Sequence, residues 1–269
     1  MNDNAKVFSL IEMREMMIDT SDYQMMEEVG EFTGTPEMKA QDKENLPTSE
    51  TITVFTPEEI KIFKDEAFST FSNGKRKYQQ ASAYILMLNT GLRTGEVLGL
   101  LNSDIDLENR VMHLNRGVKE ISKRDGVTAE KGREVKVGKL KSATSKRDVP
   151  LNDTAIEMIL DLRNEFYFGE DSPLIPDENG NFTRPVNFRK RYYRILKAAG
   201  IEIKGLHSLR HTFATNLVNG IKQADGTIKS LTPRQVADLL GHTTSEITEM
   251  YYVKRDLTKL NGITEGFEL

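Results

Sequence analysis

The sequence predicts a mixed α/β fold of the α+β kind, in which a mainly helical domain carries a small antiparallel sheet. Several segments have apolar residues at helical spacing and are bounded by typical capping residues. Between them, residues 104–115 alternate like a strand, and residues 116–147 show no helical period. These observations indicate helices around one local group of strands.

Length and composition limit the kinds of site that the chain can hold. A chain of 269 residues can bury a full core, and the absence of cysteine excludes disulfides and thiolate metal sites. The four histidines lack a close pair of carboxylates, so we expect no metal and no other cofactor. The longest apolar run, Tyr84–Leu88, is too short to cross a bilayer, and the N-terminus lacks a signal pattern. We therefore expect a cytoplasmic protein with no membrane partner.

Acidic residues are concentrated at the N-terminus. Residues 1–70 hold 6 Lys+Arg against 16 Asp+Glu, whereas residues 71–269 hold 31 against 25. The polar stretch Lys39–Thr51 has the composition of a linker. We expect residues 1–52 to form an acidic segment and linker, and residues 53–269 to form the folded domain.

Two helices are predicted at the start of the folded part. Thr56 is an N-cap, and it is followed by Pro57 and by a glutamate at the third helical position, which predicts a helix through about Ala67. A strongly apolar helix is expected over Tyr78–Asn89, ended by Gly91.

The next turn places Arg93 before a short helix that begins with Glu96 in its first turn. Arg93 can cap a carbonyl group while Glu96 favours the helix dipole. Alternatively, Glu96 holds the guanidinium of Arg93 in a fixed orientation, as a phosphate clamp requires. The sequence leaves both interpretations open.

Strands are expected in the middle of the chain. Asp104–Asn115 contains one strand, on which His113 is a strand-face residue. The segment from Lys139 onward is predicted to form a hairpin whose second strand stops at Pro150.

Three further helices are predicted from their caps. They are Thr154–Tyr167 after the N-cap Asn152, Val186–Ala199 before Gly200, and Pro233–Leu240 after the N-cap Thr232. Phe188, Tyr192 and Ile195 follow helical spacing, and we expect them in the core.

Residues 207–251 concentrate side chains that can act on a phosphate. His207 and Arg210, three residues apart, share one helix face and can meet a common anion. Gly241 is placed to end the preceding helix in an αL turn that directs His242 back between the helices. The pattern indicates a phosphate site of two imidazoles and a guanidinium with the Tyr251 hydroxyl nearby. An ordinary helix surface is the alternative, since His-x-x-Arg is common by chance.

Basic residues form two clusters. Residues 110–147 hold 12 basic and 4 acidic side chains, and residues 184–210 hold 8 basic and one acidic. Such clusters are typical of proteins that bind a polyanion such as DNA, although a solvated lysine-rich face also produces them.

Taken in chain order, these motifs resemble the catalytic domain of the tyrosine recombinases, the phage integrase family. Thr90-Gly-Leu-Arg-Thr-Gly-Glu looks like the first box of the family, and His207-Ser-Leu-Arg-His-Thr looks like its second. Leu-Leu-Gly-His followed by Tyr251 looks like its third. The segment ending in Lys-Arg-Asp-Val-Pro-Leu is similar to the β2–β3 segment of the family, and Lys141 lies where integrases of conjugative transposons carry their lysine.

The resemblance implies the catalytic set Arg93, Lys141, His207, Arg210, His242 and Tyr251, with Glu96 in a supporting role and no metal. The two arginines would bind phosphate oxygens, and His207 would accept the proton of the attacking tyrosine. By the resemblance, Lys141 would protonate the departing 5′ oxygen and a 3′-phosphotyrosyl link would form. Tyr252 directly follows Tyr251, so which hydroxyl attacks is a further question.

The expected activity is site-specific DNA recombination for the integration or excision of a mobile element. The resemblance implies double-stranded DNA as the partner, a homo-oligomer, in particular a tetramer, on that DNA, and accessory DNA-bending or directionality proteins. Members of the family usually carry a helical core-binding module ahead of the catalytic domain, so we expect either that the chain is a truncated form or that residues 1–52 are a remnant of this module. A type IB topoisomerase and a DNA-binding regulator that never cleaves are the alternatives.

Overall fold

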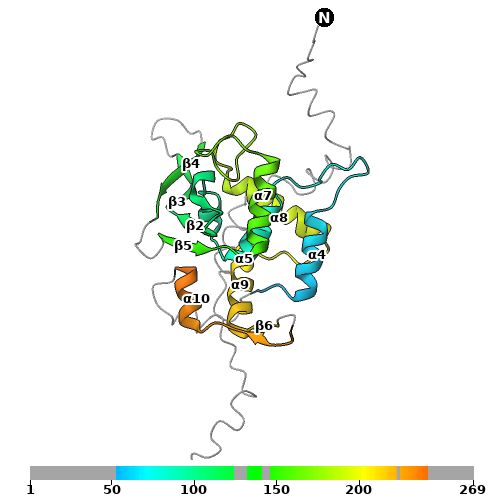
Figure 1. Ribbon diagram of the computed structural model, residues 1–269. Helices are drawn as coiled ribbons and strands as arrows, with labels where there is room; N and C mark the ends of the chain where they lie inside the picture. The colour runs from blue at the N-terminus through cyan, green and yellow to red at the C-terminus, as the bar shows by residue number, and fades with distance from the viewer. Residues whose placement is uncertain (1–52, 124–131, 141–145, 223–224, 242–269) are drawn as a thin grey trace, which may run out of the picture. The chain divides into compact units, whose positions relative to one another are not determined.

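Helices pack around short antiparallel strands in the computed structural model, which describes residues 53–123, 132–140, 146–222 and 225–241 (Figure 1). In chain order, the elements are α4 (Pro57–Ala67), α5 (Ser82–Thr90), α6 (Thr94–Val97), the 3₁₀ helix η1 (Asn102–Asp104), β1 (Ile105–Asp106), β2 (Val111–Leu114), β3 (Arg116–Lys123), β4 (Gly132–Lys139), β5 (Arg147–Pro150), α7 (Asp153–Glu165), α8 (Pro185–Ala198), α9 (His207–Asn219), β6 (Ile221–Lys222), β7 (Ile228–Lys229) and α10 (Pro233–Leu240). The predicted mixed α/β fold, mainly helical with a small antiparallel sheet, is confirmed.

The chain enters the described region alongside α9. The backbone N–H of Phe55 donates to Oγ1 of Thr212 at 2.8 Å, and the hydroxyls of Thr53 and Ser208 lie 3.0 Å apart. The predicted capping box follows directly, because Oγ1 of Thr56 accepts from the backbone N–H three residues on and α4 begins at the next residue.

The centre of the core is a group of aromatic side chains from α4, α5 and α8. The ring centroid of Tyr84 lies 4.5 Å from that of Phe188 and 5.4 Å from that of Tyr192. The Tyr192 ring also lies 5.8 Å from that of Phe63. The hydroxyl of Tyr84 donates to the carbonyl oxygen of Phe188 at 2.8 Å, which satisfies a polar group in the core. The prediction that Phe188, Tyr192 and Ile195 are core residues is confirmed.

The apolar helix α5 begins four residues later than the sequence predicts. Gln80 has a φ of 56°, and its backbone N–H donates to the Glu165 carboxylate at 2.8 Å. This turn delays the first helical residue to Ser82. The predicted end at Gly91 is confirmed, with a φ of 65° in the left-handed region.

The strands form a sheet in the order β1-β2-β5, a separate pair β3-β4 and a short pair β6-β7, all antiparallel. The predicted hairpin over Lys139–Pro150 is wrong, because β5 pairs with β2 rather than with the strand that precedes it. The register sets the buried Met112 opposite the buried Val149, and this apolar pair explains the long-range pairing. The hairpin of the basic region is β3–β4 instead.

The remaining helices agree with the caps read from the sequence. Oδ1 of Asn152 accepts from the backbone N–H of Ala155 at 2.8 Å at the start of α7. A capping box at Thr232 begins α10, which ends at Gly241 with φ 66° and ψ 43°. The β6–β7 pair fills the connection between α9 and α10. None of the helices in the described ranges has the length and apolar character needed to cross a membrane.

Candidate functional site

The turn between α5 and α6 carries Arg93 and requires glycine nearby. A Cβ at Gly91 would lie 2.5 Å from the ring of Phe213 on α9, in addition to the strain of its positive φ. A Cβ at Gly95 would lie 2.7 Å from the backbone oxygen of Val118 on β3. The turn at Gly91 is therefore packed against α9, and α6 is packed against β3 at Gly95. Arg93 lies between them as the N-cap of α6, in extended backbone.

Glu96 is 3% exposed, and each of its oxygens accepts two hydrogen bonds. Oε1 accepts from Nη1 of Arg93 at 2.8 Å and from Nη1 of Arg147 at 3.1 Å. Oε2 accepts from the backbone N–H of Arg93 at 2.9 Å and from Nη2 of Arg147 at 3.1 Å. Burial raises the pKa of this carboxyl, but the bonds and charge of Arg147, followed by those of Arg93, outweigh burial and hold the pKa below its ordinary value. Glu96 is therefore ionised at neutral pH and fixed in orientation.

Arg93 keeps donors available beside this carboxylate. Its side chain is 36% exposed. Nη1 and the backbone N–H are engaged by Glu96, whereas Nε and Nη2 have no hydrogen-bond partner within the described ranges. This arrangement suits a guanidinium that is held at one end and presented to an anion at the other. Its action on a phosphate stays a prediction.

Arg147 belongs to this site and was not among the residues predicted from the sequence. Its side chain is 8% exposed, and its Nε donates to the carbonyl oxygen of Leu239 on α10 at 2.8 Å. The sequence does hold a signal for this inward position. Arg147 and Val149 are two apart on one strand, so the burial of Val149 implies that Arg147 points to the same side.

Arg210 on α9 is also buried, with 3% of its surface exposed. Its Nη1 donates to the carbonyl oxygen of Gly91 at 2.7 Å, and its Nη2 donates to that of Leu240 at 2.8 Å. The guanidinium thus joins the turn before Arg93 to the last carbonyl of α10. The prediction that Arg210 also binds a phosphate oxygen is untested.

His207 lies one helical turn before His211, and their ring centroids are 6.4 Å apart. Partial burial lowers the pKa of His207, and the charges of Arg210 and then Arg93 lower it further, while Glu96 opposes them. The His207 imidazole is thus close enough to Arg210, Arg93 and Glu96 for their charges to act on it. Its lowered pKa favours the neutral form at pH 7. Burial, then His207 and Arg210, lower the pKa of His211 to about 4.

Four predicted residues lie outside the described ranges: Lys141, His242, Tyr251 and the adjacent Tyr252. Lys139 ends β4, and Gly241 adopts the predicted αL conformation after α10. Among the described residues, no group of three His, Asp or Glu side chains could hold a metal ion.

The elements of the site meet in one region of the domain. Figure 1 shows α10 beside α9 and below β5. Phe213 on α9 packs against a small apolar cluster that includes Val236 and Leu240 of α10. Packing and the bonds of two arginines therefore position the end of α10 relative to the turn that carries Arg93.

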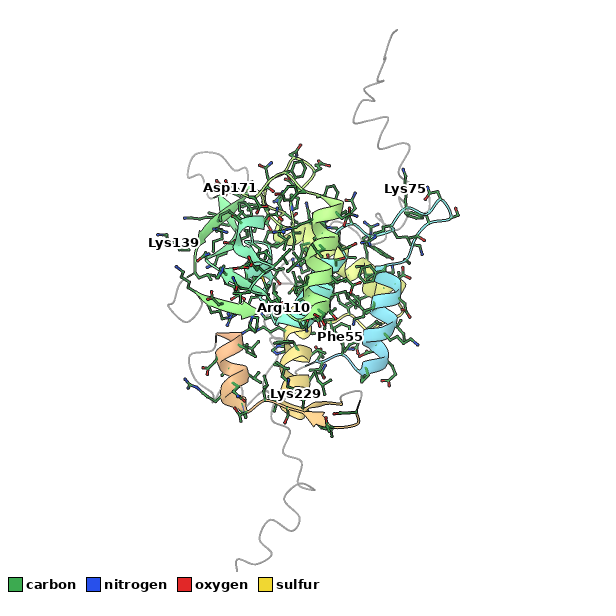
Figure 2. The ribbon with its side chains drawn as sticks, in the orientation of Figure 1. Phe55, Lys75, Arg110, Lys139, Asp171 and Lys229 are labelled. Carbon is green, nitrogen blue, oxygen red and sulfur yellow. The ribbon has the colours of Figure 1, made fainter. Side chains whose placement is uncertain are left out.

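Exposed basic residues lie on α8 and on the β3–β4 pair. We define the basic surface as Arg184, Arg189, Lys190, Arg194 and Lys197 from the α8 region, with Lys119, Lys136 and Lys139 from β3 and β4. The opposite face of α8 is buried in the core, so Arg189, Lys190, Arg194 and Lys197 are exposed, whereas Arg191 is half-buried and donates to Oε1 of Gln80 at 2.6 Å. Figure 2 shows Lys139 at the outer edge of the strand pair. Arg184 pairs with Glu120 on β3 at 2.5 Å, which links the two parts of this surface.

Solved structures of similar fold include integrases and recombinases. The Tn1549 transposon integrase in complex with a circular intermediate DNA matches with a TM-score of 0.61 and 18% identity, covering 98% of this chain and 81% of that one. The XerA recombinase matches with a TM-score of 0.51 and 22% identity, covering 78% of this chain and 63% of that one. At these identities, the similarity shows a common fold.

Relatives are also found by sequence. A XerC-like tyrosine recombinase of Caldanaerobacter subterraneus is 30% identical over 217 residues, which are 73% of this chain and 52% of that protein. The transposase of transposon Tn916 from Enterococcus faecalis is 26% identical over 219 residues, covering 74% of this chain and 47% of that protein. The chain thus spans about half the length of these relatives. Residues 54–258 match the phage integrase family, and the chain therefore belongs to that family.

Proposed function

We propose that the chain catalyses site-specific DNA recombination, in which strands are cleaved and rejoined through a covalent 3′-phosphotyrosyl intermediate, to integrate or excise a mobile element. Family membership supports strand transfer, and the similarity to the Tn916 transposase supports a mobile element. The observation that carries the proposal is the cluster of Arg93, His207 and Arg210 beside the ionised Glu96, because this is a set of groups that can bind and polarise a phosphodiester.

The proposed reaction begins with attack by the Tyr251 oxygen on the scissile phosphorus. The bond from phosphorus to the 5′ oxygen breaks, and the tyrosyl–phosphate bond replaces it. Arg93 and Arg210 stabilise the extra charge on the non-bridging oxygens as this exchange proceeds. The covalent link conserves the energy of the broken bond, so rejoining to a second strand is the reverse reaction and needs no nucleotide cofactor.

Proton transfers accompany this exchange. His207 is proposed as the acceptor of the Tyr251 proton, because its lowered pKa leaves the ring neutral and able to take a proton at pH 7. His242 is proposed to donate to a phosphate oxygen, and Lys141 to protonate the departing 5′ oxygen. These two roles rest on the order of the motifs in the sequence.

Double-stranded DNA is the proposed substrate, and the basic surface on α8, β3 and β4 is its proposed contact. Several exposed cations on one face attract the phosphate backbone of a duplex, whatever its sequence. The proposed active form on DNA is a homo-oligomer, in particular a tetramer, that is assisted by DNA-bending or directionality proteins. We assign residues 53–269 to the catalytic domain and residues 1–52 to an acidic segment and linker.

A nicked duplex made from DNA that flanks the gene of this chain tests the proposal. A nick just past the scissile phosphate lets the short product diffuse away, so the covalent intermediate accumulates. A protein–DNA adduct on a denaturing gel is the expected result. Adduct formation followed by a Holliday junction between two duplexes separates recombination from the relaxation activity of a topoisomerase. Tight binding with no adduct would instead favour a regulator that does not cleave.

A further inference from the structure

The side chain of Arg147 contacts two separate parts of the candidate site. Arg147 is the first residue of β5. Its guanidinium donates to Glu96 in α6 and to Leu239 near the end of α10. Three separate N–H groups make these contacts, at 2.8 Å, 3.1 Å and 3.1 Å. A lysine ammonium cannot reproduce this planar fork, because its donors radiate from one nitrogen.

The contact with Glu96 acts on Arg93. Each Glu96 oxygen is shared between the two arginines, so the carboxylate cannot rotate without breaking bonds to both. The side chain of Arg147 is buried, whereas that of Arg93 is 36% exposed. Arg147 is therefore the fixed partner, and through Glu96 it fixes the direction in which Arg93 presents its remaining donors.

The contact with Leu239 acts on the end of α10. The last carbonyls of a helix lack partners within the helix, and cationic side chains stabilise them. Here Arg147 takes the carbonyl of Leu239, and Arg210 takes that of Leu240. Two guanidinium groups from β5 and α9 thus hold consecutive carbonyls directly before Gly241, whose αL turn leads into the predicted His242.

We propose that Arg147 is a positioning residue for strand transfer, which aligns Arg93 through Glu96 and fixes the end of α10 through Leu239. This inference rests on the proposed function. It assigns to Arg147 a role that is separate from binding the substrate, because Nε, Nη1 and Nη2 each donate to a protein group, Leu239 or Glu96. Loss of Arg147 should misplace Arg93 and the end of α10 together while the rest of the domain stays folded.

A purely structural role is the alternative, and the reaction rate distinguishes the two. Arg76 provides a matched control, because its Nη1 and Nη2 donate to the two oxygens of Asp161 at 2.6 Å and 2.7 Å. This pair has the same two-bond geometry and contacts none of the candidate site residues. If Arg147 serves only stability, Arg147→Lys and Arg76→Lys should behave alike.

The experiment measures the first-order rate of adduct formation on the nicked duplex at saturating protein, together with DNA affinity and the thermal unfolding midpoint. We expect Arg147→Lys to slow adduct formation by about 10-fold to 10²-fold with nearly unchanged affinity, since small misplacements of reacting groups have effects of this size. Arg76→Lys should leave the rate within about twofold, which is close to the error of such a comparison. An Arg147→Lys rate equal to that of the wild type overturns the inference.

A second comparison covers the case in which removal of the buried charge unfolds the protein. Glu96→Gln combined with Arg147→Gln removes both charges and leaves no unpaired ion in the core. If Arg147 acts on Arg93 through Glu96, the double variant should be no slower than the slower single variant. If the rate defects of the two single variants instead multiply in the double variant, the proposed route through Glu96 is overturned. Absence of an adduct with the wild-type chain would overturn the proposed function, and with it any positioning role, whereas a wild-type adduct with an unaffected Arg147→Lys overturns the inference alone.

Discussion

Nη1 of Arg210 donates to the carbonyl oxygen of Gly91 at 2.7 Å, so α9 is bonded to the turn two residues before Arg93. The two arginines that are proposed to bind the phosphate are therefore not independent. A shift of the Arg210 side chain is transmitted to the backbone that carries Arg93, since Gly91 is also packed against Phe213 of the same helix.

This relationship predicts the behaviour of Arg210→Lys. Lysine keeps a positive charge but cannot hold Gly91 and Leu240 at once, so cleavage should fall by a factor on the order of 10² or more. DNA affinity should stay nearly unchanged, because the buried side chain contributes little to the surface field. The rate of adduct formation and the midpoint of a gel-shift titration measure the two quantities. Cleavage near the wild-type rate would show that Arg210 is dispensable for the reaction.

The histidines predict how stability depends on pH. The pKa of His211 is about 4 in the folded chain, below the ordinary value of 6.5, so the unfolded chain takes up the proton first. The contribution to stability is complete above about pH 6.5 and is lost as the pH falls through about 4. His207, whose pKa is also lowered, acts in the same direction. Urea midpoints should decrease from pH 7.5 to pH 5, and His211→Gln should flatten this decrease; an equal slope in the variant would contradict the assignment.

Because α6 packs closely on β3, adding one methyl group at Gly95 should strongly reduce the free energy of unfolding. Gly95→Ala would place a Cβ 2.7 Å from the Val118 backbone oxygen, which cannot move away as a side chain could. We expect a loss of about 1–3 kcal/mol in the free energy of unfolding, measured by urea denaturation. Gly138→Ala is the matched control, because a Cβ there meets no atom within 4 Å. Equal stability of both variants would refute this packing argument.

The basic surface predicts DNA binding that depends steeply on salt. Each phosphate contact releases counterions, so the logarithm of the affinity should fall linearly with the logarithm of the salt concentration. Arg189→Ala and Arg194→Ala, on the exposed face of α8, should each reduce this slope by about 1. Titrations at several salt concentrations give the slope. Affinity that is independent of salt, or slopes unchanged in both variants, would exclude α8 from the DNA contact.

The adjacent tyrosines give a prediction from sequence alone. Successive helical residues project about 100° apart, so Tyr251 and Tyr252 cannot both face one phosphate. The nine-residue interval from His242 selects Tyr251 by family resemblance. Tyr251→Phe should abolish the covalent adduct and preserve DNA binding, and Tyr252→Phe should retain both. The reverse pattern would assign the attack to Tyr252.

The sequence predicted the parts of the fold that depend on local chemistry. The N-caps at Thr56 and Thr232, the helix ends at Gly91 and Gly241, and the apolar stripe of α8 are all set by residues within one or two helical turns. For the same reason, the contact between Arg93 and Glu96, three residues apart, was foreseeable.

Long-range pairing was harder to predict. The strand ending at Pro150 pairs with β2, because Val149 meets Met112 across a register that local turn signals do not reveal. Arg147 was missed as a consequence, since alternation with Val149 indicates an inward side chain, but only the correct pairing brings that side chain to Glu96. Likewise, the proximity of Arg210 to Gly91 depends on how α9 packs, and an i to i+3 spacing with His207 carries no information about it.

The bonds from Thr53 and Phe55 to Ser208 and Thr212 have a mechanical consequence. Tension applied to the chain ahead of Thr53 is delivered first to α9, before it reaches the capped start of α4. Ser208 and Thr212 lie on either side of Arg210 along that helix, next to His207. The start of the described chain is therefore bonded directly to the helix that carries two of the proposed catalytic groups.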